Sequence, residues 1–189
     1  MMTEKETPKT ESTLKAATPK ASKYEEALSK YNTDLDDNEV REAVKKIITE
    51  KVHENDNLDV KRFLMGSIEL TTLKTTDSEE SVLAFTEKVN EFDEAFGDLP
   101  HVATICVYPC FAKVVSETLE VDGVEVACVS GSFPSSQALI EVKVAETALA
   151  VKDGATEIDI VMPVGKFLSG DYEGVADDIS EMKRACGDK

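Results

Sequence analysis

The sequence lacks the features that mark membrane-inserted, secreted and zinc-binding proteins. No run of about 18 apolar residues occurs in its 189 residues, and its start, MMTEKETPKTE, has no apolar stretch typical of a signal peptide. We therefore expect a cytoplasmic protein. The four cysteines form no CxxC pair and only two histidines accompany them, which disfavours a zinc site and favours reduced thiols.

Basic residues are also scarce. The chain has 21 lysine and arginine residues against 38 aspartate and glutamate residues, for a net charge of −17. This balance keeps a protein dispersed in water and repels phosphate backbones, so we expect no nucleic-acid partner. Hydrophobic residues make up 41% of the chain, enough for the core of one domain of ordinary size.

The N-terminal third differs from the rest. Residues 1–23 contain no aromatic residue and few bulky apolar ones, so they cannot bury enough surface to offset the entropy of ordering. We predict a disordered tail there. Residues 24–66 are charged and helix-prone, and they predict a helical segment that packs ahead of the main domain. Its apolar stripe consists of Val40, Val44, Ile47, Ile48 and Val52.

From residue 67 onward, short apolar strands alternate with segments of helical periodicity. The strands are expected within 67–73, 101–109, 124–134 and 156–165. The first helix would begin with a capping box of Asp77 and Glu80. The third helix would turn four side chains inward, namely Ile140, Val144, Ala148 and Val151. Four consecutive strand–helix units indicate a parallel sheet flanked by helices.

Two architectures fit such a sheet: an open doubly wound sheet and a (β/α)8 barrel. The nucleotide-binding motifs GxGxxG and GxxxxGK[ST] are absent, which disfavours a nucleotide-binding open sheet. Polar residues inside the strands favour the barrel, because its inner face leads up to an active site, whereas both faces of an open sheet lie under helices. We predict an α/β fold of the TIM-barrel type over residues 67–189, here an incomplete barrel of about four units.

Strand alternation places these polar residues on one face. Glu69 and Thr71 share a face of the first strand, and Cys106 faces the same side from the second. Asp159 is set among isoleucines in the fourth strand. A carboxylate there is either paired or active in proton exchange, and periodicity alone leaves both interpretations open for Asp159 and for Glu69. Cys106 is more typical of a small buried side chain than of a nucleophile.

Taken together, four stretches resemble the deoxyribose-phosphate aldolases. They are SIELTTL, TICVYPCF, VACVSGSFP and KVAETALAVKDGATEIDIVMPVGKFLSGDYEGVADDI, the last being the most specific. The resemblance spans residues 67 to about 186. It implies a class I aldolase on a TIM barrel, without metal or cofactor, acting in deoxyribonucleoside catabolism. The implied reaction is the reversible cleavage of 2-deoxyribose 5-phosphate to acetaldehyde and glyceraldehyde 3-phosphate.

In that family a lysine amine forms a Schiff base with the sugar, and an acid–base residue moves the protons. The resemblance implies that Asp159 is the acid–base residue, and Cys106 matches a cysteine that lines the family's pocket. With Glu69 and Thr71, Cys106 is predicted to form the substrate pocket. Glu69 stands where the family commonly has aspartate, which lengthens this side chain by one methylene. The stretch SFPSS also departs from the histidine or glycine often found after the phenylalanine–proline pair.

The family's Schiff-base lysine, in a KTSTG-like segment, and its glycine-rich phosphate loops have no counterpart in this sequence. Residues 67–189 are about half of the roughly 250 residues of a full barrel. We interpret the chain as the first half of an aldolase, a fragment or truncated product that is inactive alone. Lys143, Lys152 and Lys166 are expected to be exposed, and exposed lysines lack the lowered pKa that a Schiff-base lysine needs.

A non-catalytic half-barrel is the alternative interpretation. Four strands leave two open edges and an exposed inner face, so such a unit should associate with itself and serve as a binding or scaffold module. The partners expected for the aldolase are phosphosugar and aldehyde substrates and further copies of the chain. Neither a membrane nor nucleic acid is expected.

Overall fold

A computed structural model of the protein describes residues 22–189, and the chain divides into two units, residues 1–41 and 42–189. The described part of the first unit contains helix α1 (Lys23–Leu28) and the beginning of α2 (Asp37–Asn55). A capping box between Ser22 and Glu25 begins α1. The tail predicted for residues 1–23 falls almost wholly outside the described residues.

Helix α2 forms over the predicted apolar stripe, but the stripe is not buried. Its five members are 44–61% exposed, and no residue of the helix is buried. The packing of residues 24–66 ahead of the main domain stays a prediction. Ion pairs between neighbouring turns, such as Lys46 with Glu50, support the helix instead. Helix α3 (Leu58–Met65) follows, capped by the side chain of Asn57.

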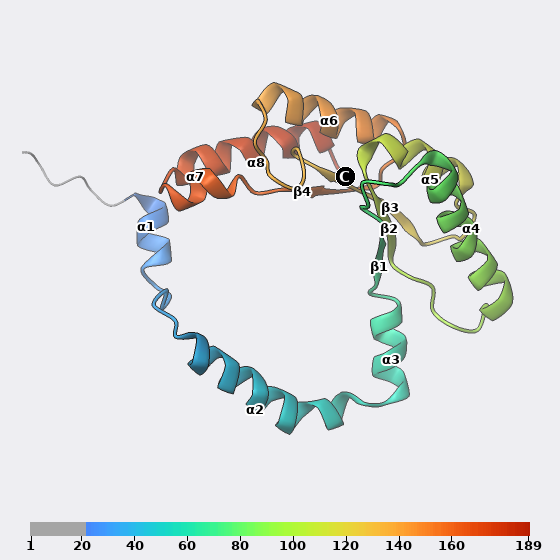
Figure 1. The fold of residues 1–189 in the computed structure, drawn as a ribbon, viewed down its shortest axis with the longest axis horizontal. Coiled ribbons are helices and arrows are strands. Elements are labelled where there is room, and N and C mark those ends of the chain that lie inside the picture. Colours follow the sequence, from blue (N-terminus) through green and yellow to red (C-terminus); the bar gives the residue numbers. More distant parts are fainter. Residues whose placement is uncertain (1–21) are drawn as a thin grey trace, which may run out of the picture. The chain divides into compact units, whose positions relative to one another are not determined.

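A four-stranded parallel sheet in the order β1-β2-β3-β4 organises the second unit. Its strands are β1 (Glu69–Thr71), β2 (Thr104–Val107), β3 (Glu125–Ser130) and β4 (Glu157–Ile160), each inside its predicted range. The intervening helices are α4 (Glu79–Phe96), α5 (Ala112–Thr118) after the 3-10 turn η1 (Pro109–Phe111), α6 (Ile140–Lys152), α7 (Val164–Leu168) and α8 (Tyr172–Cys186). Helices α4, α5, α6 and α8 lie on one side of the curved sheet (Figure 1). The predicted α/β fold with four strand–helix units is confirmed.

The main core lies between the sheet and these helices. It includes Ile105 and Val107 of β2 with Val82 of α4 and Val115 of α5, all fully buried. The opposite, concave face carries a second cluster, in which Cys106, Ala127 and Val129 contact Leu73 and Tyr108. Odd and even positions of β2 and β3 thus point to opposite faces, as strand alternation predicts.

The predicted capping box of α4 is wrong. Ser78 is the N-cap, and its hydroxyl accepts a hydrogen bond from the Ser81 N–H. The carboxylate of Asp77 instead accepts hydrogen bonds from the Thr72 hydroxyl at 2.8 Å and from the Lys74 N–H at 2.9 Å. Asp77 is held by the turn after β1, because local side-chain to backbone bonds compete with helix capping.

The inward face predicted for α6 is right only in part, because Ile140, Val144 and Val151 are half-buried and Ala148 is exposed. The buried residues of this helix are Lys143, Thr147 and Ala150. The hydroxyl of the buried Thr147 has a hydrogen-bond partner in the hydroxyl of Ser130 on β3, 2.6 Å away. The apolar pattern missed this face because two of its three members are polar side chains that have partners in the interior.

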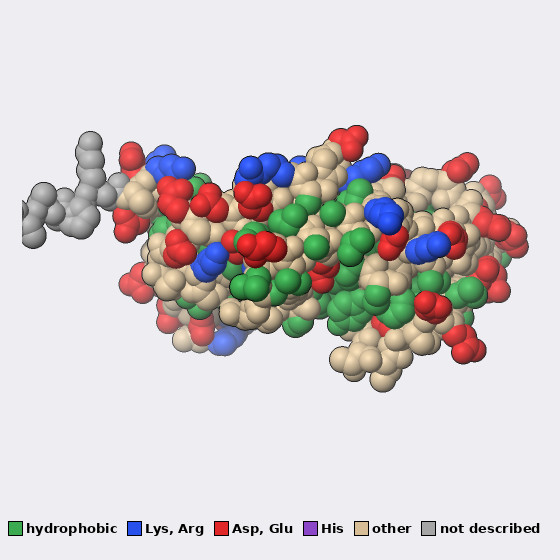
Figure 2. Space-filling view, turned by 90° about the horizontal axis from the view of Figure 1, so that it is seen from above, with side chains coloured by type: hydrophobic (Ala, Val, Ile, Leu, Met, Phe, Trp, Pro, Cys, Tyr) green, Lys and Arg blue, Asp and Glu red, His purple; other side chains and the backbone are tan. Residues whose placement is uncertain are grey.

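Figure 2 shows charged side chains, most of them acidic, scattered with small hydrophobic patches over the face that carries α6. Within residues 22–189, no helix combines the length and the apolar character needed to cross a membrane.

Candidate active site

Glu69, Cys106 and Asp159 meet on the concave face of the sheet. One oxygen or sulfur atom from each lies within 4.8 Å of the other two. The Cys106 thiol donates a long hydrogen bond of 3.7 Å to Asp159 Oδ2, and the Thr104 hydroxyl donates one of 3.4 Å to Glu69 Oε1. Thr71 lies on the same strand as Glu69, and its hydroxyl donates to the Glu69 carbonyl oxygen at 3.1 Å.

The stagger of the strands explains how residues at different ladder positions come together. Glu157 is in register with Ala127, then Cys106, then Thr71. Asp159 lies two residues beyond Glu157, and Glu69 lies two residues before Thr71. In an eight-stranded barrel of shear 8, neighbouring strands are offset by about one residue at equal height. Three such steps, from β1 to β4, compensate most of the separation between Glu69 and Asp159 along the strands. The two carboxyl groups therefore lie at about the same height in the sheet.

The carboxyl group of Glu69 has a raised pKa. Partial burial is the main cause, and the neighbouring negative charge of Asp159 and a hydrogen bond between the two side chains add to it. The negative charge of Asp159 thus favours the protonated form of Glu69, which can donate a proton.

The environment of Cys106 favours the protonated thiol over the thiolate. The residue is 1% exposed, and burial together with the charges of Glu69 and Asp159 raises the pKa of its thiol to about 12. One cation could contact all three groups, but cysteine binds metals and attacks electrophiles as a thiolate. Proton exchange between the two carboxyl groups is the chemistry that this arrangement favours.

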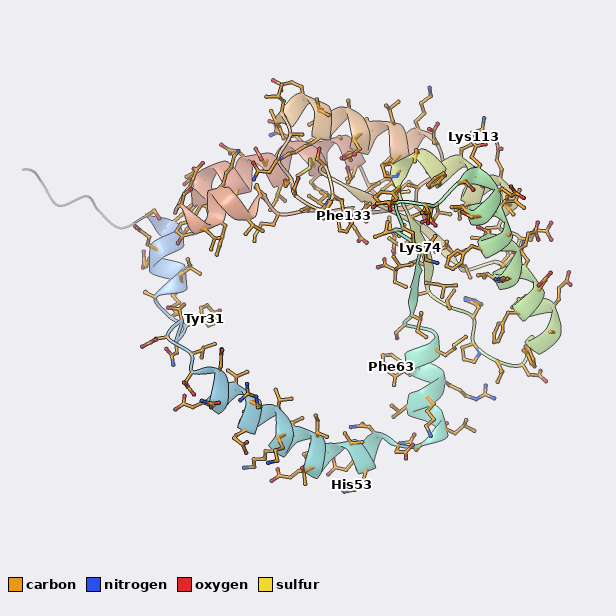
Figure 3. All side chains as sticks on the ribbon, in the orientation of Figure 1. Tyr31, His53, Phe63, Lys74, Lys113 and Phe133 are labelled. Atoms are coloured by element: carbon orange, nitrogen blue, oxygen red, sulfur yellow. The ribbon has the colours of Figure 1, made fainter. Side chains whose placement is uncertain are left out.

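Two aromatic residues that were not predicted border the same face. Tyr108 follows β2 and donates a hydrogen bond of 3.2 Å to the Leu73 carbonyl oxygen. Its ring meets that of Phe133 edge-on, with 6.3 Å between ring centroids. Figure 3 shows Phe133 on the concave side of the sheet. Continued alternation from Cys106 to position 108 would have indicated Tyr108.

The exposure expected for Lys143 is wrong. Its side chain is 2% exposed, and its ammonium group donates to Ser136 Oγ at 2.9 Å and to Asp178 Oδ2 at 3.1 Å. Lys166 is 42% exposed and donates to Asp178 Oδ1 at 2.8 Å, while Lys152 is exposed. Among the described residues, none of these lysines forms a hydrogen bond or ion pair with Glu69, Cys106 or Asp159.

Comparisons with known proteins identify relatives of this chain. A deoxyribose-phosphate aldolase from Treponema denticola is 37% identical over 122 residues, which cover 65% of this chain and 52% of that protein. A solved structure described as "QR15, an Aldolase" is 32% identical, with a TM-score of 0.55, over 64% of this chain and 50% of its own. A tetrameric deoxyribose phosphate aldolase from Aeropyrum pernix is 25% identical, with a TM-score of 0.54, over 69% of this chain and 52% of its own. No family model matches the chain.

The sheet and these similarities thus define the fold class, that of the TIM-barrel aldolases. Within this class, the chain is homologous to deoxyribose-phosphate aldolases over part of their sequence. It spans about half the length of the curated relatives it matches.

Proposed function

We propose that the concave cluster is the acid–base part of a deoxyribose-phosphate aldolase site, with Asp159 as proton donor and acceptor. The observation that carries the proposal is the contact between Asp159 and Glu69. The pKa of the Glu69 carboxyl group is raised there. A catalytic acid and base must lie within hydrogen-bond reach of each other or of the substrate, with pKa values set by burial and neighbouring charge. Cys106 and Thr71 would border the pocket.

The reaction assigned to this site is the cleavage of 2-deoxyribose 5-phosphate to acetaldehyde and glyceraldehyde 3-phosphate. A lysine amine would form a Schiff base with the sugar, and the protonated imine would accept the electron pair of the breaking carbon–carbon bond, without metal or cofactor. Asp159 would move protons during carbinolamine formation and enamine protonation. Within the described part of the chain, Lys143, Lys152 and Lys166 form no hydrogen bond or ion pair with the cluster, so we assign the Schiff-base role to none of them.

Three wider features belong to the same proposal. The substrates are small phosphosugars and aldehydes, and the setting is the catabolism of deoxyribonucleosides in the cytoplasm. Association of several copies is supported by the tetrameric relative from Aeropyrum pernix.

The test uses a hybrid enzyme. Residues 67–189 would be joined to the part of the Treponema denticola relative that this chain does not match. The hybrid is expected to cleave 2-deoxyribose 5-phosphate and to form a lysine adduct that borohydride traps, whereas the 189-residue chain alone forms none. Asp159→Asn in the hybrid should lower turnover by about 10² or more, because one acid–base group is removed.

Asp122→Asn is the matched control, because Asp122 is exposed in the loop before β3. It should leave turnover unchanged. A hybrid that folds by circular dichroism but cleaves no substrate, or that keeps full turnover after Asp159→Asn, would remove the acid–base role from this cluster.

A further inference from the structure

A second polar site lies on the helical side of the sheet. A cavity of about 770 Å³ is lined by the loop before α6, the first residue of α6, the segment around α7, and α8. Two lysines from different elements reach it, Lys143 from α6 and Lys166 from α7, together with Asp178 from α8. None of these groups belongs to the cluster around Asp159.

The cavity lining carries a positive charge in an acidic protein. Two ammonium groups face a single carboxylate, that of Asp178, and no other charged residue is part of the lining. Asp178 is 6% exposed and is shared by both lysines, at 3.1 Å from Lys143 and 2.8 Å from Lys166. Within the lining, one carboxylate neutralises one ammonium group and leaves one unit of positive charge, while Asp171 and Asp177, outside the lining, lie close enough to add to the raised pKa of Lys166.

The remaining charge is accessible through Lys166. Lys143 is enclosed and uses Ser136 as its second acceptor, whereas the Lys166 side chain is 42% exposed. Gln137, in the loop before α6, and Ser169, the C-cap of α7, also line the cavity. Gln137 offers a side-chain amide, whereas the Ser169 hydroxyl donates to the Lys166 carbonyl oxygen at 2.8 Å. Gly165 leaves room beside Gln137, because a Cβ at this glycine would lie 3.4 Å from the Gln137 amide nitrogen.

We propose that this cavity binds a phosphate group, held by Lys166 with the Gln137 amide, while Lys143 and Asp178 fix the position of Lys166. Donors from two segments suit an oxyanion that accepts hydrogen bonds in several directions. The N-terminus of α6 adds to the positive potential, since its N-cap, Leu139, has no side-chain hydrogen bond to the first turn. The site does not depend on the proposed aldolase function.

The test is a titration of the 189-residue chain with inorganic phosphate, followed through its backbone amide signals by NMR in a phosphate-free buffer. We expect saturable shifts confined to residues 136–140 and 163–169. Lys166→Gln should weaken binding about tenfold or more, because a charge-assisted hydrogen bond is lost. Lys113→Gln is the matched control: Lys113 is exposed on α5 (Figure 3), and its loss should leave binding unchanged.

Acetate forms the second arm and should bind at least tenfold more weakly than phosphate if the site prefers a tetrahedral oxyanion. Each of three results would overturn the proposal. The first is the absence of saturable shifts at these residues. The second is equal phosphate affinity in the Lys166→Gln variant, and the third is acetate binding as tight as that of phosphate.

Discussion

Glu69 is held beside Asp159 on the concave face, and its environment differs from water in two ways. Burial and the neighbouring charge both raise its pKa. Asp159→Asn removes the charge and leaves the burial, so the pKa of Glu69 should fall toward its ordinary value without reaching it. Carboxyl-carbon NMR titration measures this shift. An unchanged Glu69 titration in the variant would show that the two groups are not coupled.

The same group makes stability depend on pH. A carboxyl group whose pKa is higher in the folded state favours folding below its unfolded pKa and loses this contribution as pH rises through the folded value. The free energy of unfolding should therefore decrease over the range just above the usual glutamate pKa. Glu69→Gln cannot titrate and should flatten this slope in urea unfolding. If the free energy of unfolding of the variant depended on pH as steeply as that of the parent, other groups would be responsible for this dependence.

At the scale of elements, Asp178 joins three helices through two lysines. Burial alone would raise the pKa of Asp178, but hydrogen bonds from Lys166 and Lys143 outweigh it and lower the pKa. Asp178→Asn would leave the ammonium group of Lys143 buried without its counter-charge, at a cost of about 3–5 kcal/mol in the free energy of unfolding. Urea unfolding measures the loss.

Asp177→Asn is the neighbouring control for that experiment. Asp177 is exposed, so its substitution should change the free energy of unfolding by less than about 0.5 kcal/mol. Equal effects of the two substitutions would mean that the triad of Lys143, Asp178 and Lys166 adds little to stability.

The turn between α6 and β4 depends on Gly154. This residue has φ of +109°, and a Cβ added to it would overlap the side chain of Ser116. Gly170 has φ of +82° but open space around it. Both substitutions to alanine cost about 1–2 kcal/mol for the left-handed backbone, and Gly154→Ala adds about 1–3 kcal/mol from overpacking. Comparing the thermal unfolding of the two variants isolates the cost of the overlap with Ser116. Equal losses of stability in the two variants would contradict this steric cost.

The sequence predicts the elements better than it predicts their contacts. Strand alternation correctly separates Cys106 from its apolar neighbours, because side chains along a strand must alternate. The buried side of α6 could not be predicted, because Lys143 enters the interior only where Asp178, from a distant helix, is present to receive it. Nor could the meeting of Glu69 and Asp159 be derived from either strand, since it depends on stagger accumulated over three strand pairings.

At the scale of the whole molecule, the sheet is open at both sides. Among the described residues, β1 pairs only with β2, and β4 pairs only with β3. Unpaired strand edges favour association, whereas a net charge of −17 opposes it. Sedimentation velocity should show larger species as protein concentration rises, and more of them at high salt, where repulsion is screened. A single monomeric species under all conditions would contradict this.

The stagger across the sheet also links the pKa of Glu69 to the formation of the strand pairings. Glu69 lies on the first strand and Asp159 on the last, so the two carboxyl groups meet only after all three strand pairings have formed. A slip of one residue in a pairing would turn the side chains of the shifted strand to the opposite face of the sheet. The carboxyl group on that strand would then leave the concave face. The part of the Glu69 pKa shift that Asp159 causes therefore depends on all three pairings, and in a refolding experiment the gain of this part would accompany the docking of the fourth strand in correct register.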